Sequence, residues 1–197
     1  MNPELARLTE ILPRPADPQP APDWEAAEAA LQTSLPDDYK ELINTYGAGG
    51  IDSYLLLLEP DCPNRVFDLL KHTAERQEAN ETSLWLFEPK PTELDTEDSR
   101  LICWGTTDNG EYLYWVVKPG DDPDKRPLLI NDESGERWER YDLTVTAFLT
   151  AVLSSEVRSA ILWDNFPLPA HQFRTARELA VSRSSVTSTP ACRPQST

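Results

Sequence analysis

The chain has 197 residues and a formal net charge of −16 at pH 7, which supports one sizeable domain with an ordinary core. The excess of acid argues against autonomous binding of nucleic acid or an anionic membrane, and it favours basic partners or simply a well-solvated surface. Three widely spaced cysteines without a CxxC pair, no recognisable signal peptide and no membrane-length apolar run predict a protein of the reducing cytoplasm.

The first 22 residues are expected to form a short helix and a stiff extended arm. Apolar residues at positions 5, 8, 11 and 12 make a helical stripe, and prolines then alternate with other residues from Pro13 to Pro22. The compact domain should therefore begin at residue 23, with a helix marked by Trp24, Ala27 and Leu31.

The stretch LPDDYKELINTY, residues 35–46, is predicted to be an amphipathic helix. Ser34 with Asp37 resembles a capping box at its start, and Gly47 is the expected residue after its end, because glycine adopts the left-handed conformation easily. The apolar run from Ile51 to Leu58 that follows predicts one buried strand.

The middle of the chain predicts a helix, a strand and a hairpin. The helix covers residues 64–78, with Val66, Leu69 and Leu70 facing inward, and aromatic content predicts a strand at 83–87 before an acidic loop. Asn109-Gly110 separates two runs rich in aromatic and aliphatic residues, 101–108 and 111–117, and this is a strong hairpin signal. The second arm has no polar face, so it should be a central strand covered on both sides.

The last part of the domain is expected to add strands at 127–131 and 136–141 and a helix at 143–153, capped by Asp142, with further packing over 157–163. Beyond Pro167 order should fade, since residues 181–197 include eight Ser or Thr. Residues 158–197 hold five Arg against two acidic residues, so residues 1–157, with 13 basic and 32 acidic side chains, carry −19. The predicted organisation is therefore an arm at 1–22, an α+β domain at 23–163 and a disordered tail at 164–197.

The sequence offers no constellation typical of catalysis or of a metal site. His72 lies on a predicted helix and His171 in the predicted tail, so neither is placed as the base of a nucleophilic triad, and Cys62 with His72 lacks further ligands at short spacing. The glycines at 47–50 follow a helix and precede a strand, which is the reverse of a phosphate-binding loop. Asp121–Asp124 is interpreted as a solvated turn. We therefore expect a non-enzymatic protein without a cofactor or metal.

Two stretches together resemble the signature regions of the SUKH superfamily, which groups Smi1/Knr4-type regulators with bacterial immunity proteins. The first matches a Leu-Pro, aromatic, Tyr-Gly-x-Gly pattern at Leu35, Pro36, Tyr39, Leu42, Tyr46, Gly47 and Gly49. The second matches Trp-Gly-x-Thr-x-x-Gly followed by aromatics at Trp104, Gly105, Thr107, Gly110 and Trp115. The resemblance covers about residues 23–155 and implies an α+β fold, with a largely antiparallel sheet of five to six strands packed with N-terminal and C-terminal helices.

The resemblance also implies a function, which is to bind and neutralise a toxin domain, often a nuclease, in a bacterial polymorphic toxin system. Nucleases tend to be basic, so an acidic domain could dock on one by electrostatic steering. On this hypothesis the signature residues mainly build the fold, and charge density selects the partner-binding residues: Glu93, Asp95, Glu97, Asp98, Asp108, Glu111, Asp121, Asp122 and Asp124. The alternative is an intracellular regulatory scaffold of the Smi1/Knr4 kind.

Overall fold

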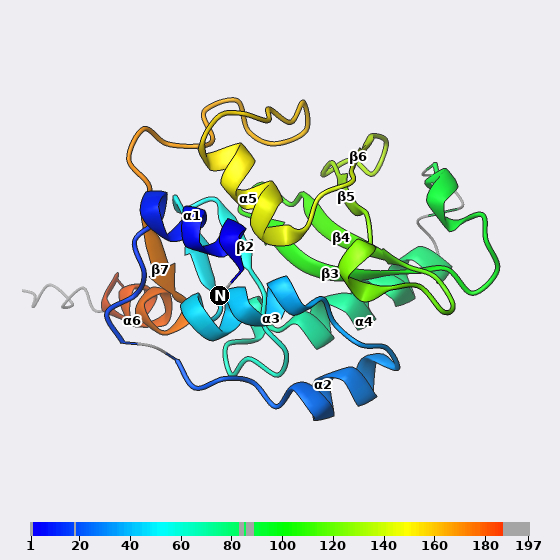
Figure 1. The fold of residues 1–197 in the computed structure, drawn as a ribbon, viewed down its shortest axis with the longest axis horizontal. Helices are drawn as coiled ribbons and strands as arrows, with labels where there is room; N and C mark the ends of the chain where they lie inside the picture. The colour runs from blue at the N-terminus through cyan, green and yellow to red at the C-terminus, as the bar shows by residue number, and fades with distance from the viewer. Residues whose placement is uncertain (1, 18, 83–84, 86–88, 187–197) are drawn as a thin grey trace, which may run out of the picture.

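The computed structural model describes residues 2–17, 19–82, 85 and 89–186. These residues form a seven-stranded antiparallel sheet with helices on both faces (Figure 1). The strand order is β6-β5-β4-β3-β2-β1-β7, so that β3 lies at the centre. The predicted α+β class, with a largely antiparallel sheet and terminal helices, is confirmed, but the sheet has seven strands instead of the expected five to six.

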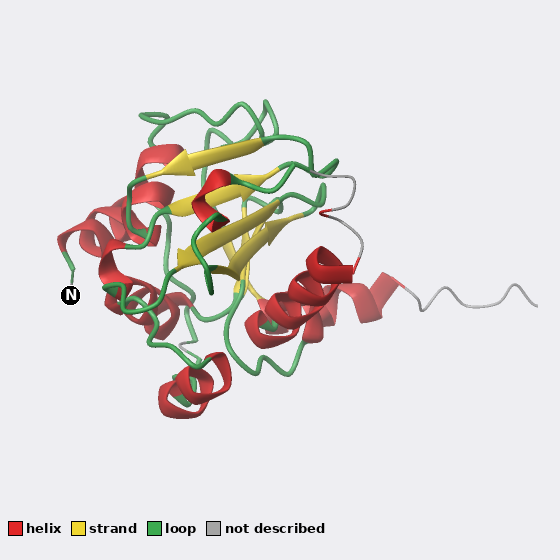
Figure 2. Cartoon of the chain, turned by 90° about the vertical axis from the view of Figure 1, so that its right-hand side faces the viewer, coloured by secondary structure: helices red, strands yellow, loops and turns green. Residues whose placement is uncertain are grey.

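The sheet separates two groups of helices (Figure 2). The strands are β1 (Gly49–Ile51), β2 (Leu55–Leu57), β3 (Arg100–Thr107), β4 (Tyr112–Val117), β5 (Leu128–Asn131), β6 (Trp138–Tyr141) and β7 (Phe173–Thr175). The helices are α1 (Pro3–Ile11), α2 (Trp24–Leu31), α3 (Asp37–Tyr46), α4 (Leu69–Thr82), α5 (Val145–Leu153) and α6 (Ala176–Val186). Single 3₁₀ turns are η1 (Arg65–Phe67), η3 (Thr92–Leu94) and η4 (Pro123–Lys125). Helices α1, α3 and α5 cover one face, and α4 and α6 lie on the other.

The core is centred on the β3–β4 hairpin, whose strands are buried on both faces, as the sequence predicts for the second arm, β4. Trp104 and Trp115 are at most 1% exposed. The ring of Tyr39 on α3 meets Trp115 edge-on at 4.8 Å between centroids, and Phe148 on α5 meets Trp104 at 6.1 Å. Gly110 turns the hairpin with φ +101°. Edge-to-face packing of this kind adds to the burial of apolar area.

Helix α1 is part of this core, because Leu5, Leu8 and Leu12 are at most 1% exposed. It packs against α5 and α3, and the Tyr46 hydroxyl donates a hydrogen bond of 2.7 Å to the Leu12 carbonyl. The short N-terminal helix of the sequence prediction is therefore present, and it closes the α3–α5 layer.

The single strand predicted over 51–58 is wrong, because the chain turns back within it. Asp52 and Ser53 have φ values of +52° and +57°, and Tyr54 N–H donates to the Ile51 carbonyl at 3.0 Å. Strands β1 and β2 are thus the two arms of a hairpin. Aspartate is one of the few residues that tolerate the left-handed conformation, and its carboxylate here accepts hydrogen bonds from another segment.

Two further local predictions are wrong, and a third concerns residues that the structure mostly does not describe. Helix α4 begins only at Leu69, after η1, because Asn64 and Asp68 bond to nearby backbone N–H groups; Val66 is 39% exposed. The cap of α5 is Thr144 rather than Asp142. Most of the strand predicted over 83–87 lies outside the described residues.

The predicted fading of order after Pro167 does not hold for residues 168–186. Strand β7 pairs with β1, and α6 follows it with Leu179 over β1. The cause is the buried Asp52 carboxylate, which accepts hydrogen bonds of 2.9–3.1 Å from Leu168 N–H, His171 Nδ1 and Gln172 N–H. The remainder of the predicted tail, 187–197, lies outside the described residues.

Candidate functional site

The acidic residues selected from the sequence lie at two opposite ends of the β3–β4 hairpin. Arg100 at the start of β3 pairs with Val117 at the end of β4. The loop 95–99, which leads into β3, and the loop 118–127, which leaves β4, are therefore neighbours. The turn that carries Asp108 and Glu111 lies at the other end of the two strands, so the nine residues do not form one patch.

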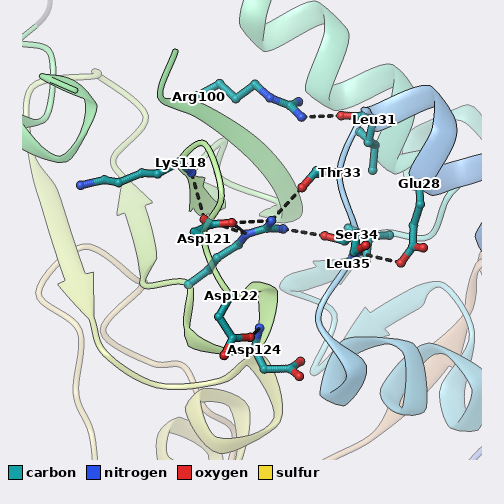
Figure 3. A network of polar contacts seen from close by, with 11 residues as sticks. Glu28, Leu31, Thr33, Ser34, Leu35, Arg100, Lys118, Asp121, Asp122 and Asp124 are labelled. Atoms are coloured by element: carbon teal, nitrogen blue, oxygen red, sulfur yellow. Dashed lines mark hydrogen bonds and ion pairs between the residues drawn. The ribbon is translucent and has the colours of Figure 1, made fainter. Parts of the chain in front are cut away.

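A buried arginine organises the loop between β4 and β5. The Arg126 side chain is 2% exposed and donates to both carboxylate oxygens of Asp121, to the Ser34 carbonyl at 2.7 Å and to the Thr33 hydroxyl at 2.7 Å. These contacts tie the loop to the linker before α3 (Figure 3). Burial acts to raise the pKa of Asp121, but the Arg126 and Lys118 N–H donors outweigh it and hold the pKa below its ordinary value.

Two further carboxylates of this loop have partners within the protein. Asp124 Oδ1 accepts a hydrogen bond of 2.7 Å from the Asp37 N–H, at the first residue of α3. It thereby supplies the cap that the sequence assigned to Ser34, since Pro36 precedes the helix without a side-chain cap. Asp122 pairs with Lys125 at 2.8 Å, and this contact lowers the pKa of Asp122.

The loop before β3 has a different character. Glu93 on η3 is half-buried and pairs with Arg140 at 3.5 Å. Asp95, Glu97 and Asp98 are exposed, and no lysine, arginine or histidine within the described ranges forms a salt bridge with them. We call these three residues the acidic loop. Their carboxylates face solvent, and Asp98 shares a surface hollow with Arg100 and Lys118 without forming a salt bridge to either.

At the other end of the hairpin, Asp108 is exposed, whereas Glu111 is only 6% exposed. The Glu111 carboxylate accepts a hydrogen bond from the Thr107 hydroxyl, and its N–H donates to Thr107 Oγ1 at 3.2 Å. Glu111 therefore holds the turn closed, and only Asp108 presents a free carboxylate there.

The sequence prediction did not include Asp37, an exposed acidic residue beside the loop between β4 and β5. The Asp37 side chain is 82% exposed, and it begins the helix that Asp124 caps. Asp37 also lies 3.5 Å from the Lys40 ammonium. The adjacent Asp37-Asp38 pair could have indicated it, because an aspartate in the first turn of a helix normally faces solvent or the helix dipole.

The signature residues lie in the core or at turns. The Tyr39 hydroxyl donates to the Leu58 carbonyl at 2.6 Å, and Leu35, Tyr46, Trp104 and Trp115 are at most 1% exposed. A Cβ atom on Gly49 would lie 2.3 Å from the Arg174 carbonyl oxygen, so only glycine fits beside β7. These residues are buried beneath the surface loops or, like Gly49, fit where a side chain would clash.

The chemistry available at the acidic loop is the binding of cationic groups. Within the described part of the chain, no group of three His, Cys, Asp or Glu side chains is arranged to hold a metal ion. None of the described helices has the length and apolar character that crossing a bilayer requires. Exposed carboxylates without salt bridges are suited to lysine and arginine side chains of another protein.

Comparison with known proteins gives one family. A family model described as "SMI1-KNR4 cell-wall", of the SUKH group, matches residues 22–149. No curated protein and no solved structure shows a significant match. The match contains α2–α4, β1–β6 and the first part of α5, up to residue 149, while α1, β7 and α6 lie outside it.

Proposed function

The chain belongs to the SMI1-KNR4 family of the SUKH superfamily, and from this premise we propose that it is a non-enzymatic immunity protein. It binds and neutralises a cognate, basic toxin domain, such as a nuclease, in a bacterial polymorphic toxin system. The family supports interaction with another protein as the general role. The toxin, its charge and its class are the proposal.

The observation that carries the proposal is the acidic loop. Asp95, Glu97 and Asp98 are exposed within four residues of each other and lack salt bridges to the described part of the chain. Such a group is unfavourable for the isolated protein, because the like charges repel and no salt bridge with the described residues offsets them. A basic partner removes that repulsion on binding.

The support beneath the acidic loop favours a fixed surface. The start of β3 follows the loop directly, and the Arg100 guanidinium donates to the Leu31 carbonyl at the end of α2. The neighbouring loop is held by the buried Arg126–Asp121 pair. A preorganised charged surface loses little conformational freedom when it binds, and charge complementarity raises the association rate.

The first test is co-expression with the protein encoded immediately beside this one in its genome. We expect the neighbour to be toxic alone, host survival when both are present, and co-purification of a stable complex. A harmless neighbour that forms no complex would contradict the immunity function.

The second test locates the surface. The triple change Asp95→Asn, Glu97→Gln and Asp98→Asn should weaken the complex by at least about tenfold at low ionic strength, mainly by slowing association. The matched control removes three exposed charges elsewhere, through Glu10→Gln, Glu25→Gln and Glu136→Gln. Equal effects of the two variants would mean that only overall charge matters and that the acidic loop is not the interface.

The regulatory scaffold is the second candidate, because the description of the matched family, "SMI1-KNR4 cell-wall", refers to the cell wall and not to a toxin. A scaffold would hold several cellular partners weakly, whereas an immunity protein holds one partner tightly. Affinity capture with the full chain distinguishes them. Several substoichiometric partners and no toxic neighbour would support the scaffold.

A further inference from the structure

A cavity of about 600 Å³ lies away from the acidic loop, between the start of β1, the segment after β2 and helix α6. This volume is within the range of about 300–1,000 Å³ that is typical of small-ligand sites. Its walls combine small apolar side chains with a carboxylate, a thiol, two amides and one guanidinium. They are formed by Gln19, Ala48, Glu59, Cys62, Pro63, Asn64, Ala176, Arg177 and Ala180.

Glu59 is the only acidic residue of these walls, and the structure holds it firmly. Its backbone is fixed on both sides, because Glu59 N–H donates to the Phe67 carbonyl and Leu69 N–H donates to the Glu59 carbonyl, each at 2.9 Å. Its carboxylate oxygen Oε2 accepts a hydrogen bond of 2.8 Å from the Ala48 N–H. The carboxylate therefore has a fixed position in the cavity wall.

The charge of this carboxylate is not compensated by a cation. Burial raises the pKa of Glu59, and the hydrogen bonds from the Ala48 N–H and the Cys62 thiol only partly oppose this effect. No lysine, arginine or histidine in the described part of the chain forms a salt bridge with Glu59. A half-buried carboxylate without a counter-charge reduces stability, and such groups are often retained because they bind a ligand.

We infer that this cavity receives a lysine or arginine side chain of a protein partner, whose cationic head group pairs with Glu59. Charge complementarity selects the occupant, because a cation supplies what the carboxylate lacks. The small side chains of Ala48, Ala176 and Ala180 leave room for an aliphatic stem. This inference rests on the proposed function, since it places one anchoring contact of the basic partner far from the acidic loop.

Arg177 determines how strongly the site selects its occupant. It is exposed on α6, lines the same cavity and makes no salt bridge with Glu59. Its positive charge repels an entering cation, so Arg177 and Glu59 act in opposite directions on the same ligand. Replacing each of them by glutamine should change binding with opposite sign.

The test needs no identified partner. The probe is Nα-acetyl-L-lysine methylamide, with Nα-acetyl-L-norleucine methylamide as the uncharged control of similar length. The Ala48 amide bonds directly to Glu59, so its NMR chemical shift reports the state of the carboxylate. We expect the lysine probe to shift the Ala48 amide in a saturable manner and to lower the pKa of Glu59, while the norleucine probe does neither. Equal responses to both probes would overturn the inference.

The variants Glu59→Gln and Arg177→Gln provide the second readout. Glutamine at 59 keeps an acceptor for the Ala48 N–H and removes the charge, so binding of the lysine probe should fall by about tenfold while thermal stability stays the same or rises. Arg177→Gln should strengthen binding of the lysine probe roughly two- to threefold, because it removes an exposed charge of the same sign as the probe. Glu136→Gln, on an exposed turn, should change neither.

The outcomes separate this inference from the proposed function. If Glu59→Gln leaves the probe affinity unchanged, the cavity is not a cation site, even if the neighbouring toxin is neutralised. If the neighbour proves harmless but the lysine probe binds through Glu59, the immunity function fails and the cation site stands.

Discussion

The Arg126–Asp121 pair shows how one buried residue positions a surface loop. The guanidinium is 2% exposed, and its donors are used by Asp121, Ser34 and Thr33. A buried pair of this kind adds little compared with an apolar replacement of both partners, but removal of one partner leaves a charge without compensation. The loop geometry therefore depends on Asp121 remaining ionised.

We predict that Asp121→Asn lowers the free energy of unfolding by about 3 kcal/mol at pH 7, because Arg126 stays buried beside a neutral amide. The folded-state pKa of Asp121 is lowered, so its contribution is complete above the unfolded pKa of about 3.9 and is lost as the pH falls through the folded value. Urea unfolding at pH 7, 5 and 3 should show a constant difference between the two proteins at the upper values and a smaller one at pH 3.

The control for this prediction is Asp122→Asn in the same loop. Asp122 pairs with the exposed Lys125, and solvent screens such surface pairs so that they contribute little to stability. Its loss should therefore change the unfolding free energy only slightly. A difference for Asp121→Asn that does not depend on pH would show that the effect comes from loop packing and not from the charge.

At the same scale, two distant aspartates bond to the first residues of helices, and local sequence signals could not show these contacts. Asp38 Oδ2 accepts from the Thr146 N–H at 2.9 Å and the Thr146 hydroxyl at 3.1 Å, near the start of α5. Asp124 does the same for the first residue of α3. These partners are 108 and 87 residues apart in the chain. Capping rules read only neighbouring residues, so they assigned the cap of α3 to Ser34, and they could not show that Asp38 adds to the local cap Thr144 at the start of α5.

At the level of elements, the two glycines of β1 differ in the space that surrounds them. A Cβ on Gly49 would lie 2.3 Å from the Arg174 carbonyl and 2.5 Å from the Phe173 ring, both on β7. A Cβ on Gly50 would meet only the ends of two flexible side chains, Leu179 at 3.3 Å and Leu56 at 3.6 Å. The two positions are adjacent, but one borders rigid backbone and the other side chains that can move.

We predict that Gly49→Ala displaces β7 from the sheet and lowers stability by about 2–3 kcal/mol, the range of overpacked cores, whereas Gly50→Ala costs less than about 1 kcal/mol. Amide hydrogen exchange measures the effect directly, since protection should be lost at residues 173–175 in the first variant and retained in the second. Equal protection of β7 in both variants would show that the strand can shift to accommodate the extra methyl group.

The elements with local signals were predictable, and those set by distant contacts were not. The helical period of residues 35–46 and the Asn109-Gly110 turn led directly to α3 and to the β3–β4 hairpin. The turn at Asp52–Ser53 has no glycine, and β7 depends on a carboxylate 116–120 residues away. For the candidate site, charge density located the acidic loop, but it could not separate Asp95 from the buried Glu111, because burial is a property of the folded chain.

At the scale of the whole molecule, the net charge opposes folding and assists binding. Residues 1–157 carry −19, and compaction brings these charges together. Salt bridges such as Arg126–Asp121 offset only a few of them. Screening should therefore stabilise the free protein, whereas it should weaken a complex with a basic partner over the same range of ionic strength.

We predict that raising NaCl from 20 to 300 mM increases the Tm of the free protein by about 2–4 °C, equivalent to about 1 kcal/mol for a chain of this size. The triple variant of the acidic loop, Asp95→Asn, Glu97→Gln and Asp98→Asn, has less repulsion to screen and should gain less from the same salt. Differential scanning calorimetry of both proteins measures the two increments. If the Tm of the wild-type protein falls with salt, attractive ion pairs outweigh the repulsion between like charges. Relief of repulsion in the acidic loop would then not explain why a basic partner binds there.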